Sequence, residues 1–272
     1  MRDLAILVRA GNLGLAGAGV LAGGWIAVAA VVTPPALWWA TLSGIALGAV
    51  GNVLNDLWDR PADRINRPDR PLAAGTLAPR TARLIAAGGA AIGLGAAVAV
   101  GRWQVLMAAG ALAVMLAYSP LLKPRGLPGN LAVALVASLP LPYGALAVGQ
   151  VAAGWLPFAI AAWIHLTREI MKDIADVEGD RSLGRRTLPI VLGPEVSRRA
   201  VWALAGLFVP LSAAPVLAGY GWEYLLLAIP ADAVLVAAAV RLRRPDGAPP
   251  AARLSKVAMG LGLAGLVLGR AL

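Results

Sequence analysis

The chain has 272 residues, of which 59% are hydrophobic and only 14% are charged, and its mean hydropathy is +0.75. This composition excludes an ordinary soluble domain and is typical of a multi-pass membrane protein. Cysteine is absent and His165 is the single histidine, which excludes disulfides, thiolate metal sites and multi-histidine metal sites. The net charge of +10 is typical of basic cytoplasmic loops, so we expect no nucleic-acid partner.

Nine apolar stretches are each long enough to cross a bilayer as a helix, which requires roughly 20 residues. We therefore predict an all-α fold with nine transmembrane helices, in a single domain that covers residues 1–272. The predicted spans are 13–32, 35–55, 82–100, 103–121, 129–149, 155–173, 199–219, 222–241 and 253–270.

Positive charge is concentrated in every second connection between these spans. All Lys and Arg residues except Arg102 and Arg270 lie at the N-terminus, in the connections after the second, fourth, sixth and eighth spans, or at the adjoining helix ends. Cytoplasmic loops of membrane proteins carry such an excess of Lys and Arg. We therefore predict a protein of the cell (inner) membrane whose N-terminus and even-numbered connections face the cytoplasm.

Two of these connections carry the pattern Asp-x-x-Asp-x-x-x-Asp. The first acidic motif is Asp56, Asp59 and Asp63, and the second acidic motif is Asp173, Asp176 and Asp180. The motifs are 117 positions apart, which predicts two related four-helix halves followed by one extra helix. Of the 14 acidic residues, four lie in 56–69 and five in 169–180, and carboxylates clustered at a membrane require a partner.

The spacing of these carboxylates predicts a site for a metal and a diphosphate. Each residue of a helix advances by about 100°, so Asn55, Asp59 and Asp63 would share one face. Glu169 would likewise share one face with the second motif. Facing each other, the two sets could bind Mg²⁺ through carboxylate oxygens and the Asn55 carbonyl, with phosphate completing the shell. Cations suited to diphosphate follow or separate the motifs: Arg64, Arg67, Arg70, Lys123, Arg125, Lys172, Arg181, Arg185 and Arg186.

Three residues inside or beside the spans bear on the shape and extent of this site. Pro61 disfavours helical geometry at Arg60, so we expect the helix to end near Asp59 and Asp63 to lie in a loop. His165 lies one turn before Glu169 and either lines the same site or is a core histidine. Asp232 is an acid within the eighth span and either marks a site or has a helix-packing role.

These motifs resemble those of the UbiA-type family of intramembrane prenyltransferases. The family's first signature, Asn-Asp-x-x-Asp-x-x-x-Asp, matches residues 55–63, and its second, Asp-x-x-x-Asp, matches residues 176–180. The resemblance covers essentially the whole chain, and residues 168–180 most resemble the branch that makes archaeal-type lipids. Further matches, in the family's order, are Arg9, Asn12, Asn66, Arg67, Arg70, Tyr118, Lys123, Asn130, 178–181 and 187–189.

The resemblance implies the nine-helix fold and a Mg²⁺-dependent transfer of a prenyl group from its diphosphate. It implies catalytic roles for Asp56, Asp59, Asp63, Asp173, Asp176 and Asp180. It implies a metal site formed by Asn55, Asp59, Asp63, Asp176 and Asp180. It implies that the diphosphate or the acceptor is bound by Arg9, Asn12, Arg64, Arg67, Tyr118, Lys123 and Lys172. The isoprenoid tail is expected among apolar helix faces that open sideways to lipid.

The acceptor is left open by the sequence. In the archaeal-lipid branch a geranylgeranyl group passes to geranylgeranylglyceryl phosphate and forms an ether lipid. Quinone and chlorophyll branches prenylate aromatic acceptors such as 4-hydroxybenzoate, and another polar acceptor would fit the same mechanism. An ion-coupled transporter is a third hypothesis, but transporters usually place their ion sites near the membrane midplane in broken helices. Here both acidic motifs lie at one membrane face.

Overall fold

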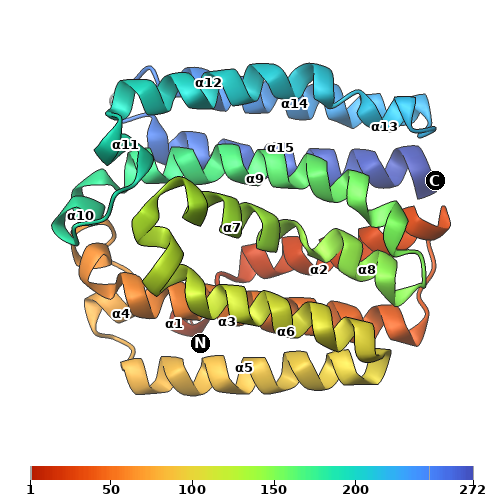
Figure 1. Ribbon diagram of the computed structural model, residues 1–272, viewed down its shortest axis with the longest axis horizontal. Coiled ribbons are helices and arrows are strands. Elements are labelled where there is room, and N and C mark those ends of the chain that lie inside the picture. The colour runs from red at the N-terminus through yellow and green to blue at the C-terminus, as the bar shows by residue number, and fades with distance from the viewer. Residues whose placement is uncertain (1, 245, 272) are drawn as a thin grey trace.

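The computed structural model describes residues 2–244 and 246–271. This part of the chain is helical and contains no strand, which confirms the predicted all-α fold. The long helices lie side by side along the long axis of the molecule (Figure 1).

The N-terminal helices are α1 (Arg2–Val8), α2 (Ala10–Val28), α3 (Pro35–Asn66), α4 (Pro71–Ala74), α5 (Pro79–Val100), α6 (Arg102–Ala117), the π-helical turn η1 (Tyr118–Leu122), η2 (Lys123–Arg125), α7 (Leu127–Ser138) and α8 (Pro140–Ala147). The remaining ones are η3 (Val151–Gly154), α9 (Trp155–Ala175), α10 (Val177–Ser182), α11 (Leu188–Val191), α12 (Pro194–Leu211), α13 (Ala214–Leu217), η4 (Trp222–Tyr224), α14 (Leu225–Arg241) and α15 (Ala248–Ala271).

Eight helical segments in the described ranges are long and apolar enough to cross a membrane. They correspond to all of the predicted spans except the sixth, which is α9. α9 has 21 residues, but its last turns carry Arg168, Glu169, Lys172 and Asp173. The count of nine transmembrane helices, the two related halves and the single domain therefore stay predictions.

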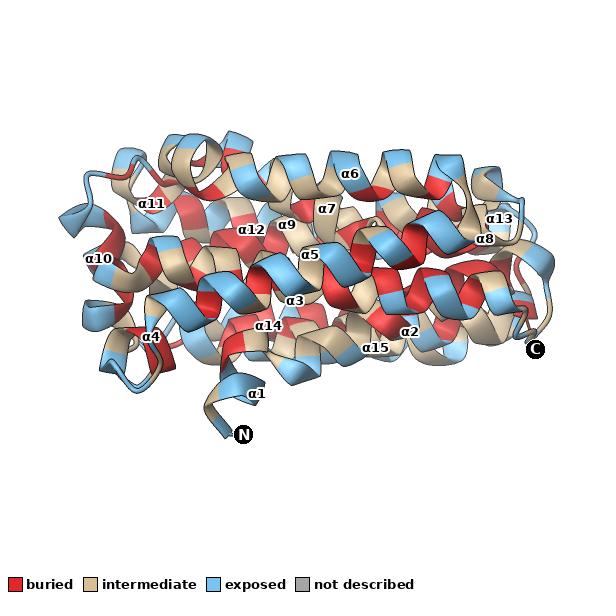
Figure 2. Ribbon diagram, turned by 90° about the horizontal axis from the view of Figure 1, so that it is seen from below, coloured by how far each residue is buried: buried red, intermediate tan, exposed pale blue. Residues whose placement is uncertain are grey.

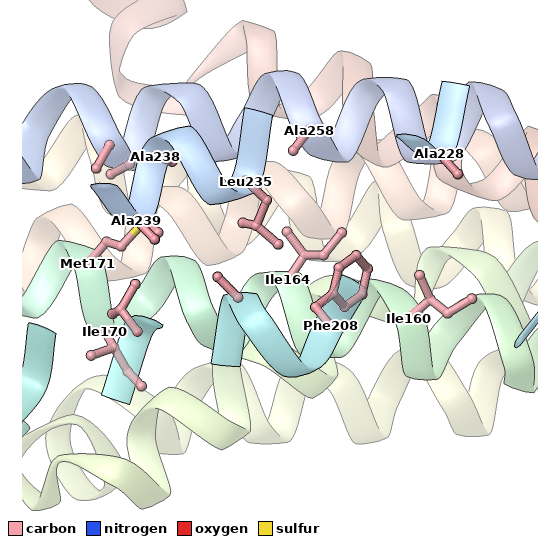
Figure 3. Close-up of a cluster of buried hydrophobic side chains, with 14 of the residues drawn as sticks. Ile160, Ile164, Ile170, Met171, Phe208, Ala228, Leu235, Ala238, Ala239 and Ala258 are labelled. Carbon is pink, nitrogen blue, oxygen red and sulfur yellow. The ribbon is translucent and has the colours of Figure 1, made fainter. Parts of the chain in front are cut away.

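Apolar side chains fill three regions of the bundle. In one, α9, α12, α14 and α15 share a core in which Ile164, Phe208 and Leu235 point toward one another (Figure 3). In the second, α2, α3, α5, α6 and α8 pack around Val20, Leu37 and other residues. In the third, α1, α3, α4 and α5 pack around Leu7, Val50 and Leu72. The outward turns of α5 and α6 are exposed (Figure 2) and carry large apolar side chains, as expected for surfaces that face lipid.

The expectation that the helix would end near Asp59 is wrong. α3 continues through Pro61 to Asn66, so Asp63 is helical and buried. A proline inside a helix removes one backbone hydrogen bond and crowds the preceding turn. Here contacts of the last turn with the rest of the protein offset that cost. Among them, the Asn66 side chain donates one hydrogen bond to the Asp176 carbonyl and accepts one from the Gly179 N–H of α10.

The spacing suggested that the second acidic motif lies on one continuous helix. The structure shows instead that this segment is broken into two helices. α9 ends at Ala175, and Asp176 stands at a break, with φ −105° and ψ 8°, before α10 begins. Asp173 therefore belongs to α9 and Asp180 to α10. The break lets α10 fold against the end of α3, where the first acidic motif lies.

Candidate active site

The two acidic motifs meet at the end of the bundle where α10 and α4 lie, on the left in Figure 1. A buried arginine joins them: Arg185 donates one hydrogen bond to Asp59 at 2.6 Å and another to Asp180 at 2.6 Å. The Lys123 ammonium pairs with the second oxygen of Asp59. Asp59 and Asp180, one from each motif, thus share Arg185, and Asp59 also pairs with Lys123.

The other aspartates of the first motif are held by two further arginines. Arg70 lies just before α4 and donates to Asp63 at 2.7 Å and to Asp56 at 3.0 Å. Arg9 donates to the same Asp56 oxygen at 2.6 Å. Arg9 itself has left-handed backbone geometry, with φ 55°, at the junction of α1 and α2. A non-glycine residue in that region is strained, and such strain is found at functional sites.

Asp176 and the start of α10 are tied to the last turn of α3. Arg67 donates to both oxygens of Asp176, at 2.7 and 2.9 Å. The Asn66 amide donates to the Asp176 carbonyl at 3.0 Å and accepts from the Gly179 backbone at 3.0 Å. The two motifs are therefore connected by backbone contacts as well as by charge.

The last turns of α9 carry a third group of charges. Glu169 is buried and accepts from Lys172 at 2.6 Å and from Arg168 at 3.0 Å. Asp173 is buried too and accepts from the Asn130 amide of α7 at 2.9 Å. These contacts satisfy the buried carboxylates, which would otherwise be costly to keep charged.

Burial and neighbouring charges also shift the pKa values of site residues outside the predicted spans. Burial raises the pKa of the Asp180 carboxyl, and the charges of Lys123 and Arg185 offset this only in part. Burial also lowers the pKa of Arg185, but Asp59 and Asp180 outweigh it, so the pKa of that guanidinium is raised. Arg185 therefore remains a cation between the two carboxylates.

A cavity of about 330 Å³ extends from this charged end between α2, α3, α6, α7, α9 and α15. Five of the predicted site residues line it: Arg9, Asn12, Asn55, Tyr118 and Lys172. Tyr118 lies on the π-helical turn η1, a local irregularity that is frequent at functional sites. Farther along, the walls are apolar or glycine, for example Gly48, Leu139 and Leu263. A molecule with a charged head and a long apolar tail suits this shape.

Comparison with known proteins places the chain in a family. A model of the UbiA prenyltransferase family matches residues 16–262. The chain belongs to the UbiA prenyltransferase family. It is therefore a prenyltransferase and a multi-pass membrane protein. A digeranylgeranylglyceryl phosphate synthase of Methanopyrus kandleri is 40% identical over 267 residues, which cover 97% of each chain.

Solved structures share the fold of this UbiA family member. A structure reported for digeranylgeranylglyceryl phosphate synthase in membranes has a TM-score of 0.75 at 26% identity, covering 99% of this chain and 98% of the other. A UbiA homolog from Archaeoglobus fulgidus, bound to GPP and Mg²⁺, has a TM-score of 0.68 at 20% identity, covering 97% and 99%. The predicted UbiA-type fold is thereby confirmed.

The structure also gives specific contacts in this prenyltransferase site to residues that the sequence had named only as nearby cations or as family matches. Arg70, Arg185 and Asn130 each contact an aspartate of one of the motifs. Arg64, which was expected to bind substrate, is exposed and makes no side-chain ion pair within the described residues. A signal for Arg185 was present: Gly184, with φ 66°, closes a turn that returns Arg185 to the Asp180 carbonyl.

His165 and Asp232, for which the sequence left two roles open, have different surroundings. His165 lines the cavity, which supports a place at the site. Asp232 accepts a hydrogen bond from Ser212 at 2.6 Å, and Ser212 accepts one from Tyr224 at 2.8 Å through its carbonyl. This network joins the end of α12 to η4 and α14, which supports the helix-packing role.

The donor chemistry of the site fits Mg²⁺. No three carboxylates or histidines in the described ranges are grouped so that they could hold one ion together. Each carboxylate of the motifs is instead paired with an arginine, a lysine or an amide. Carboxylate oxygens are ligands that Mg²⁺ prefers, and the cations beside them suit a diphosphate. The metal-binding set Asn55, Asp59, Asp63, Asp176 and Asp180 stays a prediction.

Proposed function

We propose that this prenyltransferase transfers a geranylgeranyl group from its diphosphate to geranylgeranylglyceryl phosphate, forming an ether lipid and releasing diphosphate. The observation that carries the proposal is the pairing of buried aspartates with cations at one end of the bundle, together with a mostly apolar cavity that Arg9, Asn55 and Lys172 line. The 40% identity to a digeranylgeranylglyceryl phosphate synthase supports this acceptor.

Mg²⁺ is the cofactor of the proposed reaction, as the A. fulgidus homolog bound to GPP and Mg²⁺ suggests. Asn55, Asp59, Asp63, Asp176 and Asp180 would hold it. When bound, the metal neutralises negative charge on the departing diphosphate.

The chain's own cations bind the diphosphate in this proposal. Lys123, Arg185 and Arg67 lie beside the aspartates and can donate to phosphate oxygens instead. As the bond between the prenyl carbon and the diphosphate breaks, negative charge grows on the leaving group and these contacts strengthen. The apolar walls keep water from the allylic carbon, so the acceptor hydroxyl oxygen forms the new bond to that carbon, and its proton passes to the released diphosphate.

The proposed membrane is the cell (inner) membrane, with the N-terminus and the site facing the cytoplasm. The distribution of Lys and Arg supports this orientation, because the connections at the site end are the basic ones. Substrates would then be supplied and diphosphate released on the cytoplasmic side.

The test is an assay of the purified protein in detergent with Mg²⁺ and geranylgeranyl diphosphate, with geranylgeranylglyceryl phosphate and 4-hydroxybenzoate offered in parallel. We expect ether formation with the glyceryl phosphate, lost in Asp59→Ala and Asp180→Ala. Asp69→Ala, which removes an exposed carboxylate near the first motif, should keep activity. Transfer only to 4-hydroxybenzoate would refute the acceptor, and no diphosphate release with either would refute the reaction.

A further inference from the structure

Four basic side chains line the cavity beyond the two acidic motifs: Arg9, Arg168, Lys172 and Lys256. We call them the basic cluster. They come from the start of α2, the end of α9 and the first half of α15. The charges of Arg9, Arg168 and Lys172 all act on Lys256, so the four heads share one electrostatic environment.

The basic cluster carries more positive than negative charge. Arg168 and Lys172 share Glu169, and Arg9 shares Asp56 with Arg70. Within the described residues Lys256 makes no ion pair, and its ammonium donates to the Asn12 amide oxygen at 2.8 Å. This leaves the Asn12 amide nitrogen able to donate to another acceptor. By contrast, each cation around Asp59 and Asp180 is matched by a carboxylate.

Two anions in one cavity need separate sets of cations. The donor's diphosphate and a phosphate on the acceptor repel each other at close range, and the repulsion is strong where water is excluded. The aspartates and their partners suit the diphosphate, because carboxylates can bind its metal. The basic cluster has more cations than carboxylates and suits a phosphate without a metal.

We propose that the basic cluster binds the phosphate of the acceptor lipid, and that Lys256 sets the preference for a phosphorylated over an uncharged acceptor. This inference rests on the proposed function, because it takes a lipid phosphate as the acceptor. Lys256 acts in binding, through its charge, and Asn12 holds it in place and contributes an amide donor. The prenyl diphosphate does not contact Lys256.

The test compares Lys256→Gln, which can still donate to Asn12 but has no charge, with Lys256→Arg, which keeps the charge. Arg253→Gln removes an exposed cation one turn earlier on the same helix and is the matched control. Equilibrium binding to the purified protein is measured for geranylgeranylglyceryl phosphate and for geranylgeranylglycerol, which lacks the phosphate. Steady-state rates give KM for acceptor and donor separately.

We expect Lys256→Gln to weaken binding of the phosphorylated lipid by at least about tenfold, the usual effect of losing one charge-assisted hydrogen bond. Binding of geranylgeranylglycerol and KM for geranylgeranyl diphosphate should stay within about twofold of the wild type by the same reasoning. Lys256→Arg should restore most of the lost affinity, and Arg253→Gln should behave like the wild type.

Equal weakening of both lipids would assign Lys256 to packing and overturn the inference. A raised KM for geranylgeranyl diphosphate would assign it to the donor and overturn it too. If the wild type binds the phosphorylated lipid in a Lys256-dependent way but does not prenylate it, the proposed function fails and the inference stands. If the wild type binds both lipids equally well, the inference fails whatever the turnover.

Discussion

At the residue scale, Arg185 lies outside both acidic motifs but connects them. Its side chain is 6% exposed and holds one carboxylate from each acidic motif. Removing one member of a buried ion pair costs about 3–5 kcal/mol, because the remaining charge stays away from water. The same contact therefore supports both stability and the arrangement of the diphosphate site.

Arg185→Ala should lower both activity and stability. Asp180 loses its ion pair and Asp59 keeps only Lys123. We expect kcat/KM for the prenyl diphosphate to fall by at least about a hundredfold and Tm in detergent to drop, given the cost of a broken buried pair. Arg186→Ala removes an exposed neighbour and should change neither quantity. Equal losses in both variants would mean that the loop, and not this contact, was damaged.

The sequence could predict the carboxylates of the site but few of their partners. Asp59 and Asp63 lie four residues apart on α3, so helical periodicity alone places them on one face. Arg70 and Arg185 reach the same carboxylates from loops, whose paths no periodicity describes. Asn130 contacts Asp173 from a different helix, which only tertiary packing can bring there.

At the scale of elements, α3 and α10 meet through a glycine. A Cβ atom on Gly179 would lie 2.8 Å from the Ala62 carbonyl oxygen and would also collide with the Asn66 amide. Both groups belong to the last turns of α3, next to Asp63. The approach of the two motifs thus requires a residue without a side chain at this position.

Gly179→Ala should separate the motifs and reduce prenyl transfer. The backbone at Ala62 cannot yield without moving α3, so we expect a loss of at least about tenfold in rate and a lower Tm, as is usual for overpacking of about 1–3 kcal/mol. Gly206→Ala is the control, because a Cβ there meets nothing within 4 Å. A Gly179→Ala protein with unchanged rate and Tm would contradict this picture of the junction.

Element boundaries were harder to predict than the elements themselves. The apolar runs predict the long helices because length and hydropathy decide them. Tertiary contacts decide the ends: those of Asn66 offset the effect of Pro61 on α3, and the break at Asp176 lets α10 turn back. Pro140 similarly starts a separate helix, α8, inside what the hydropathy predicts as one span.

At the scale of the whole molecule, a cavity that begins at the charged end lies between two of the three apolar cores. Gly48 lines this cavity about 10 Å along α3 from Asn55, at 1.5 Å per residue. A Cβ atom at Gly48 would lie 3.4 Å from the nearest atom, on Leu13, which is an ordinary contact distance. A larger side chain at this position would therefore occupy space in the cavity without forcing α3 away from α2.

Gly48→Leu should shorten the tail that the cavity accepts. We expect KM for geranylgeranyl diphosphate to rise at least about tenfold, since insertion of methylenes into a filled space costs roughly 1–3 kcal/mol. Geranyl diphosphate, which is two isoprenoid units shorter, should be affected less. Gly88→Leu, on an open surface of α5, should affect neither donor. An equal rise for both donors would show that the tail does not pass Gly48.

The charges at the end of α9 also bear on how the protein reaches the bilayer during synthesis. Arg168, Glu169, Lys172 and Asp173 each raise the free energy of inserting a helix by up to about 3 kcal/mol, less near its ends. α9 is thus a poor membrane segment by itself. In the folded protein Arg168 and Lys172 pair with Glu169, and the Asn130 amide of α7 donates a hydrogen bond to Asp173. If α9 is a ninth transmembrane helix, it would therefore enter the membrane with help from neighbouring helices that are already there.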